Sequence, residues 1–510
     1  MSRSRPRILR SCKESIERRL QPVPWTVQTE PMLSAANLHY EMADRARAIP
    51  CGGIGLMLRM ALQLGLRELI DTQLRIFKDR RPYFESDHIF SIVMNLLAGG
   101  TCLEDIELRR NDENYLNALG AQRVPDPTTA GDFCRRFDQA DVENLLRIIN
   151  EVRLEVWKRQ PRAFFDEAIL DVDASIVETL GRCKEGADFS HDKKFGYQVL
   201  VVSLANTGEL LHLSVRSGNR PSHEGAAQAL REITRFCKRA GFREVTIRGD
   251  TDYSMTHEFD PWNEDDSRFV VGYDALPKVV RIASELPESQ WRLLERRDKN
   301  PVKTDPRSRP ENVRERIVVE REYKNFNLQR EDLAEFTYRP IACGRPYRMV
   351  VVRKTILVTK GQAIIDGAEQ RYFFYATNDW IAPAESIVFD ANDRCNQENL
   401  FSQLGAAGIL QAPLGDLLSN WAYMVIASLA WTLKAWFALL LPDGGRWAGR
   451  RRGEKNRVLK MKFRTFLNAF MLVPAQVVRS GRRLVYRILS WNPWRAVFFR
   501  AWDSVQALRC

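Results

Sequence analysis

Two aspartates interrupt an apolar run near residue 170, and their spacing suits them to hold a cation. The apolar residues of 168–175 are typical of a buried strand. Asp171 and Asp173 are one strand period apart, so both side chains point to the same face. A buried carboxylate needs a cation or a donor as partner, and a divalent metal ion would supply it. Alternatively, Asp173 ends the strand and turns the chain through its side chain.

A second acidic stretch, Arg248-Gly-Asp-Thr-Asp252, follows another expected strand. The first and fourth strands are expected to be neighbours in such a sheet. Asp173 and Asp250 would then meet at one edge of it, with Asp252 as the alternative to Asp250. A third acid from a later helix would complete a site for two divalent ions. Such sites clamp the attacking and leaving oxygens of a phosphodiester. The alternation that places these acids predicts strands at 168–175, 197–205, 210–215, 244–247 and 269–273, and an amphipathic helix at 223–240.

Composition narrows the class of protein. The 510 residues carry a formal net charge of +12, which points toward a polyanion such as nucleic acid. The nine cysteines form no CxxC pair, so a zinc ribbon is not expected, and their odd number argues against a secreted disulfide scaffold. The basic N-terminus lacks the apolar core of a signal peptide. A cytoplasmic, nucleoid-associated protein is therefore expected.

One apolar segment, 421–442, resembles a membrane span in length. It contains Lys434 near its middle, where a charge would be costly in lipid. We therefore expect a buried helix there and no membrane partner.

The remaining patterns divide the chain into segments. Residues 1–50 form a basic arm, 51–160 a helical domain for DNA binding or dimerisation, and 443–510 a basic helical region. Asp126-Pro-Thr-Thr predicts a Thr cap before a helix at 130–137. Between the two ends, 161–274 and 381–442 form an α/β core. Within it, 275–380 reads as a β-rich insertion, with a helix over 279–297 and strands at 317–322, 335–338, 347–352 and 371–375.

Several motifs together resemble those of one enzyme family, the DDE transposases of the insertion-sequence-4-like superfamily, and most closely its insertion-sequence-1380 family. The resemblance covers roughly residues 50–440. It is carried by Asp173-Ala-Ser, Arg248-Gly-Asp-Thr-Asp-Tyr, Tyr375-Ala-Thr-Asn378, Arg394-Cys-Asn-Gln-Glu398 and the small apolar helix 420–433.

The resemblance implies an RNase H-like mixed sheet and Mg²⁺-dependent DNA cleavage at insertion-sequence ends, followed by strand transfer into target DNA. Two Mg²⁺ ions, for which Mn²⁺ could substitute, would be held by Asp173, Asp250 and Glu398. Arg394 would lie one helical turn before Glu398, on the same face of a helix over 385–404, and contact a phosphate. Synapsis of two ends implies a homodimer or higher oligomer. Asp171 is the alternative to Asp173 as the first ligand, and the serine two residues after Asp173 resembles the family motif. The alternative acids for the third position are Asp393 and Glu385, which lack this spacing from the arginine.

Two positions depart from the superfamily pattern: Ala391 replaces a tyrosine and Gly405 a lysine that hold terminal phosphates. Lys193 and Lys194 are candidates to supply such contacts, or else form a solvated loop pair. The basic tail is a candidate DNA surface or a solvated face, and its cations are Arg450, Arg451, Arg452 and Lys455. Two other functions remain open: a DNA-binding protein with a decayed nuclease site, and an RNase H-like nuclease without strand transfer.

Overall fold

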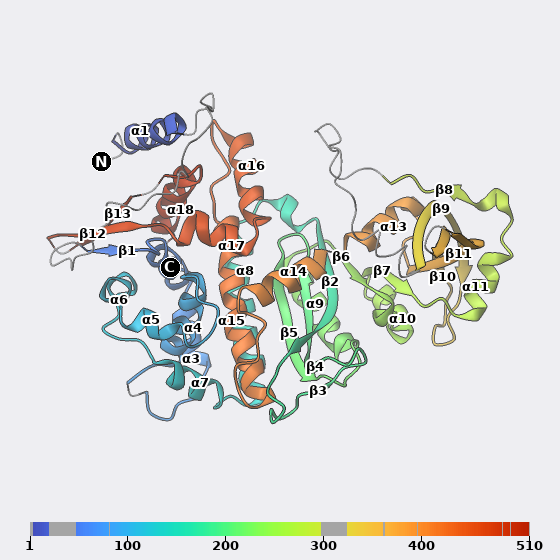
Figure 1. Cartoon of the computed structure of the whole chain (residues 1–510), viewed down its shortest axis with the longest axis horizontal. Coiled ribbons are helices and arrows are strands. Elements are labelled where there is room, and N and C mark those ends of the chain that lie inside the picture. The colour runs from blue at the N-terminus through green and yellow to red at the C-terminus, as the bar shows by residue number, and fades with distance from the viewer. Residues whose placement is uncertain are drawn as a thin grey trace.

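A mixed β-sheet runs through the middle of the protein (Figure 1). The computed structural model describes residues 4–19, 47–80, 82–296, 324–360, 363–394, 396–481, 483–489 and 491–508. The strands of this sheet are β2 (Glu167–Glu178), β3 (Asp188–Phe189), β4 (Phe195–Leu204), β5 (Glu209–Ser217), β6 (Glu244–Gly249), β7 (Arg268–Tyr273), β8 (Arg292–Leu293), β9 (Lys324–Tyr338), β10 (Tyr347–Lys360) and β11 (Ala363–Thr377). They are arranged in the order β3-β4-β2-β6-β7-β11-β10-β9-β8, with β5 also paired to β4. The mixed α/β class and the five expected core strands are confirmed.

The pairing of β2 with β6 sets the geometry of the acids. The two strands are neighbours, as expected. They pair in parallel, and Asp171 lies opposite Arg248. Continuing this register by two residues brings Asp173 level with Asp250, which follows the end of β6. Strand β7 lies parallel on the other side of β6. The first two acids therefore come from adjacent positions on adjacent strands.

Helices cover the sheet. Helix α9 (Ala226–Ala240) packs on β2, β4 and β6 and ends at Gly241, whose φ of 104° suits a glycine C-cap. Helix α13 (Ala384–Asp393) packs on β6 and β7, and α14 (Asn396–Ala406) packs on β2. The expectation of one helix over 385–404 is wrong, because the chain breaks between α13 and α14 at Arg394. The other helical segments of the core are η1 (Arg162–Phe165), η2 (Thr251–Tyr253) and α10 (Thr256–Glu264).

The segment read as an insertion extends the sheet itself. Strand β11 pairs antiparallel with β7, with Tyr375 opposite Gly272, and β10 and β9 continue outward. The expected strands at 335–338, 347–352 and 371–375 are confirmed and are longer than predicted. The expected helix over 279–297 is only partly right, since α11 (Pro277–Ser284) gives way to η3 (Glu288–Gln290) and β8. The expected strand at 317–322 lies outside the described residues.

The N-terminal helices and the C-terminal region form one body beside the sheet (Figure 1). The N-terminal helices are α1 (Ser4–Arg19), α2 (Ile54–Gln63), α3 (Leu66–Gln73), α4 (Glu85–Leu97), α5 (Ile106–Arg110), α6 (Glu113–Leu119), α7 (Pro127–Cys134) and α8 (Gln139–Trp157). Helix α7 is capped by the Asp126 carboxylate, which accepts from Thr129 N, rather than by a threonine as expected. Helix α15 (Leu417–Leu439) packs against α4, α8 and β5.

Helix α15 is the apolar segment that could be taken for a membrane span. Among the described residues it alone is long and apolar enough to cross a bilayer, and its apolar window is wholly buried inside the protein. Lys434 donates to Leu459 O at 3.0 Å and lies over the Trp431 ring, so its charge is partnered within the fold. The expectation of a buried helix is confirmed.

A buried carboxylate joins these helices to the sheet. Glu209, at the start of β5, is fully buried and accepts four side-chain hydrogen bonds. The donors are Arg153 of α8 (3.0 Å), Trp157 of α8 (3.0 Å), Thr207 (2.7 Å) and Trp436 of α15 (2.9 Å). Because a buried charge is tolerated only when it is well partnered, this residue fixes the position of α8 and α15 on the sheet edge.

The C-terminal region contains a β-hairpin that the expectation of a helical tail missed. Strands β12 (Ala475–Ser480) and β13 (Arg483–Ile488) pair with each other, and β12 also pairs with β1 (Ala48–Ile49) near the N-terminus. The turn uses Gly481 at a φ of 59°. The helical elements of this region are α16 (Ala448–Leu459), α17 (Phe463–Phe466), the π-helical η4 (Leu467–Met471) and α18 (Arg495–Ala507).

Candidate active site

Asp173 lies in β2 on the face covered by α13 and α14. Its Oδ1 accepts a hydrogen bond from Ala174 N at 2.8 Å, and its Oδ2 lies 2.9 Å from Arg394 Nη1. Burial raises the pKa of this carboxyl to about 6; Arg394 opposes the rise, whereas the charges of Asp250 and Glu398 add to it. The single arginine therefore does not supply enough positive charge to keep Asp173 at its ordinary acidity.

Asp250 uses one carboxylate oxygen to stabilise a turn and directs the other toward the candidate site. Its Oδ1 accepts from Asp252 N at 3.0 Å and caps η2, while its Oδ2 lies 3.8 Å from the same Arg394 Nη1. Burial raises the pKa of Asp250, and Arg394 opposes this rise. Each aspartate thus has one oxygen held by the backbone and the other directed at a common cation. Asp252, the alternative, is exposed.

Two glycines allow the Asp250 turn to pack this closely. A Cβ on Gly272 of β7 would lie 2.8 Å from Thr251 N and 3.0 Å from Asp250 C. A Cβ on Gly249 would lie 2.7 Å from the Tyr253 Cβ. Real Cβ atoms do not approach other atoms so closely, so a larger residue at either position would displace the turn. These positioning residues are ones that the sequence reasoning missed, although an isolated glycine within the apolar strand 269–273 is a recognised sign of close backbone approach.

Glu398 is the candidate for the third acid, and it lies in the first turn of α14. Gln397, Leu400 and Leu404 of this helix are buried, and Gln397 accepts from Ser203 of β4 at 2.6 Å. The neighbouring face of α14 carries Glu398, which is exposed. Its charge acts on both aspartates, so the three acids share one electrostatic environment.

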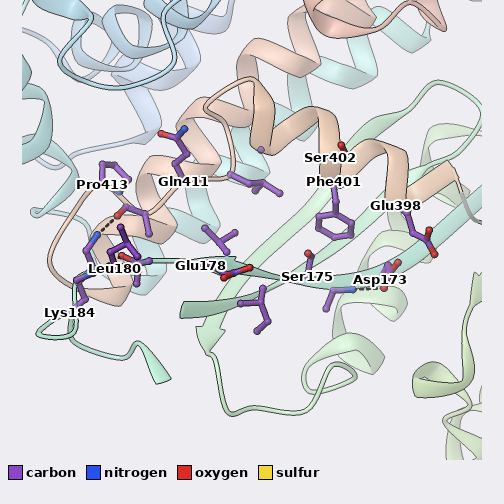
Figure 2. A pocket seen from close by; sticks show the side chains of 18 residues that line it. Asp173, Ser175, Glu178, Leu180, Lys184, Glu398, Phe401, Ser402, Gln411 and Pro413 are labelled. Atoms are coloured by element: carbon purple, nitrogen blue, oxygen red, sulfur yellow. Dashed lines mark hydrogen bonds between the residues drawn. The ribbon is translucent and has the colours of Figure 1, made fainter. Parts of the chain in front are cut away.

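A groove of about 870 Å³ extends from Asp173 and Glu398 along the second half of β2. Figure 2 shows Asp173 and Glu398 at one end and Lys184 at the other. Phe401 and Ser402 of α14 form one wall, and the 410–413 segment closes the side. The groove is therefore acidic at the site and mixed in character along its length.

Arg394 lies between the acids because it caps the end of α13 instead of continuing into the helix of Glu398. The expectation that the two residues share one helical face is therefore wrong. Its side chain is 14% exposed, and its Nη1 contacts Asp173 and approaches Asp250.

Asp171 has a different role, which separates it from its neighbour in β2. Both of its oxygens are bound by Arg248, with Nε to Oδ1 at 2.7 Å and Nη2 to Oδ2 at 2.9 Å. The pair is almost wholly buried, and Arg248 also donates to Asp390 O of α13. A carboxylate held in this two-pronged manner has no oxygen left for a metal ion, which favours Asp173 as the first ligand. Sequence reasoning overlooked Arg248 as this partner, although it lies immediately before Gly249-Asp250.

The donor set suits a hard divalent cation. Three carboxylates against one guanidinium leave the site with net negative charge, and carboxylate oxygens are the ligands that Mg²⁺ and Mn²⁺ prefer. As the described residues lie, no group of three acids is close enough together to enclose an ion. The aspartates alone converge, and it is Arg394 that lies between them.

The candidate phosphate contacts lie in two places. Lys193 is in the turn before β4 with a φ of 60°, and Lys194 Nζ lies 3.8 Å from Glu178, which lines the groove. This loop is therefore adjacent to the groove on the side away from the acids.

The basic residues of the tail fall in α16. Arg450 and Arg452 are exposed, although Arg450 pairs with Glu454 at 3.0 Å. Arg451 donates to Gly444 O at 2.7 Å. Lys455 is only 13% exposed and contacts Asp443 (3.3 Å) and Gln160, which ties α16 to the end of α8. Arg450 and Arg452 are thus better placed than Lys455 to reach a ligand.

A DDE enzyme is expected to carry its acids on two neighbouring strands of a mixed sheet and on a following helix. The candidate acids of this chain have that arrangement. The chain belongs to the family described as transposase DDE domain group 1, whose profile matches residues 47–510. It is a transposase of a family that acts on DNA and uses divalent metal ions.

The chain was also compared with solved structures and with curated proteins. The chain is similar to a cryo-EM structure of the piggyBac transposase synaptic complex with hairpin DNA, at 11% identity and a TM-score of 0.38, covering 91% of this chain and 86% of that one. A search of curated proteins gave no significant match.

Proposed function

We propose that this protein cleaves DNA at the ends of an insertion sequence and transfers the freed strands into target DNA. The observation that carries the proposal is the convergence of Asp173 and Asp250 on one cationic nitrogen, 2.9 and 3.8 Å away, with Glu398 at the same end of the groove. The order of the core strands, three antiparallel strands followed by parallel β6 and β7, supports an RNase H-like core. The motifs favour placement in the insertion-sequence-1380 family.

Asp173, Asp250 and Glu398 would hold two Mg²⁺ ions, for which Mn²⁺ could substitute. Bound there, the ions supply stabilisation of the attacking and leaving oxygens of a phosphodiester. The residues of this chain orient and tune the site. Ala174 N and Asp252 N each hold one aspartate oxygen in place, and the Asp173 side chain is only 14% exposed at the end of the groove. The glycines at 249 and 272 keep the Asp250 turn against the sheet.

DNA would approach the site from the groove and from the basic surfaces. Lys193 and Lys194 lie beside the groove, and Arg450, Arg451 and Arg452 lie on α16. Positive side chains contribute to DNA binding chiefly through phosphates, so these contacts would position the duplex without reading sequence. A homodimer or higher oligomer would bring two ends together, and a cytoplasmic, nucleoid-associated location fits such a partner.

The test is a cleavage and strand-transfer assay on DNA that carries the terminal inverted repeats found beside the gene. The parent protein with Mg²⁺ should nick and join this DNA, and Asp250→Ala should bind it without cutting. Asp252→Ala, one of the neighbouring acids outside the proposed ligand set, is the matched control and should retain activity. If the parent binds the ends but does not cut, the protein is a decayed, DNA-binding relative. If it cuts without joining, it is a nuclease.

A further inference from the structure

We infer that the Arg394 guanidinium occupies the cation position between Asp173 and Asp250 in the DNA-free protein, and that a divalent ion binds there only by displacing it. The inference rests on the proposed metal site and adds to it a competing internal cation. Three observations carry it: the position of the guanidinium, its mode of contact and the location of Arg394 in the fold.

The position of the cation follows from the oxygen atom of each aspartate that no backbone N–H group binds. Asp173 Oδ1 and Asp250 Oδ1 are bound by backbone N–H groups, so only the two Oδ2 atoms are directed at a cation. Both Oδ2 atoms are directed at Arg394 Nη1, at 2.9 and 3.8 Å. A Mg²⁺ ion binds oxygen at about 2.0–2.1 Å. An ion shared by these oxygens and the nitrogen that now lies between them would overlap, so the two cations exclude each other.

The mode of contact makes Arg394 exchangeable. Arg248 grips both oxygens of Asp171 with two nitrogens, which is the strongest geometry for an arginine and a carboxylate. Arg394 reaches both aspartates through a single nitrogen, Nη1. On the same face of β2, Arg248 is therefore held by two hydrogen bonds to one carboxylate. Arg394, which contacts the acids through one nitrogen, is the arginine that a divalent ion could displace from them.

The location of Arg394 at the junction of two helices allows its side chain to move away from the acids. It caps the C-terminus of α13, immediately before α14, so rotation about its own side chain or a small shift of this junction would withdraw it from the acids. Once withdrawn, the guanidinium keeps its charge and lies beside the site, where a DNA phosphate is a suitable new partner. Phosphate and divalent ion would then favour each other's binding, because each one removes the arginine from the acids or holds it away.

The experiment measures Mn²⁺ binding to the DNA-free full-length protein by electron paramagnetic resonance. Arg394→Gln, which removes the competing charge but keeps a polar side chain, should bind Mn²⁺ about tenfold more tightly than the parent, a typical size for coupling between two sites. Arg394→Lys, which keeps the charge, should bind close to the parent. Arg268→Gln is the matched control, because Arg268 pairs with Asp379 and Asp390 and does not touch the aspartates of the site; its Mn²⁺ affinity should be unchanged.

A second measurement keeps the inference testable if Arg394→Gln does not fold. In Arg394→Gly, guanidinium chloride at low, non-denaturing concentration should compete with Mn²⁺, and in the parent it should not. Equal or weaker Mn²⁺ binding by Arg394→Gln, or no competition by guanidinium, would overturn the inference. The Asp173→Asn variant separates this failure from that of the proposed function. Suppose that the Arg394 variants give one of these contrary results. If Asp173→Asn then has the same Mn²⁺ affinity as the parent, the metal site itself is misassigned. If Asp173→Asn instead abolishes Mn²⁺ binding, the metal site stands and only the role of Arg394 is wrong.

Discussion

Replacing Asp173 by asparagine should stabilise the metal-free protein at neutral pH, although it removes a proposed ligand. Burial raises the pKa of this carboxyl from its ordinary 3.8 to about 6. The folded protein therefore holds the proton more tightly than the unfolded chain does, and stability falls as the pH rises from about 4 through 6. The full cost is present above pH 6. The difference between a pKa of 3.8 and one of about 6, at 1.36 kcal/mol per pKa unit, corresponds to about 3 kcal/mol.

Asparagine has nearly the shape of protonated aspartic acid and carries no charge, so Asp173→Asn should avoid this cost. In urea unfolding with EDTA present, we expect the variant to exceed the parent by about 3 kcal/mol at pH 7.5 and to match it near pH 4. The matched control is Asp171→Asn, two residues away on the same face. Burial raises the pKa of Asp171 as well. That change, however, also leaves the buried Arg248 without the carboxylate that binds two of its nitrogens, and this loss should dominate and destabilise by about 3–5 kcal/mol at pH 7.5.

The two substitutions should thus act in opposite directions at pH 7.5. A loss of stability in Asp173→Asn at pH 7.5, or a gain of the same size at both pH values, would refute the reasoning. The first result would mean that Arg394 fully compensates Asp173. The second would mean that the gain has nothing to do with ionisation.

Three further changes test other parts of the structure. Glu209→Ala should destabilise by about 3–5 kcal/mol in urea unfolding, because it strands the buried Arg153; a loss below 1 kcal/mol would show that the cluster does not fix α8. Gly272→Ala should lower DNA cleavage and weaken Mn²⁺ binding with the fold retained by circular dichroism, since its Cβ would displace the Asp250 turn; unchanged Mn²⁺ affinity would exclude this positioning role. Gly405→Lys should raise stability by up to about 1 kcal/mol, because a Cβ there meets nothing within 4 Å and glycine is a poor helix former. It should also tighten binding of end DNA in a salt-dependent manner, and unaltered affinity would show that DNA does not reach this part of the groove.

The core of the site could be predicted because its signals are local. The strand around Asp173 and the strand before Asp250 follow from alternation, and their adjacency follows from the usual order of such sheets. The choice between Asp171 and Asp173 could not be made from their spacing, because both side chains point to one face. It depends on which aspartate Arg248 reaches across the strands, and that depends on register.

Other parts were mispredicted for identifiable reasons. The sequence around the helix break at Arg394 contains no proline or glycine that would predict it. The hairpin of β12 and β13 does have a signal, since two alternating runs flank Ser480-Gly481. The expectation of a helical tail rests instead on the dense basic and aromatic residues of this region. The Glu209 cluster joins residues from 153 to 436, and no pattern within a single segment indicates that such distant residues meet.

The pairing of β1 with β12 has a consequence for how the polypeptide is made. Ile49 can pair with Ala475 only after the ribosome has added more than four hundred further residues. At ordinary rates of synthesis this takes roughly 20–90 s. Helix α15, which packs against α4 and α8, is also made late. The amino-terminal helices therefore complete their folding only when the product is almost finished. A gene copy truncated before its last tenth would lose the beginning of the fold together with its end.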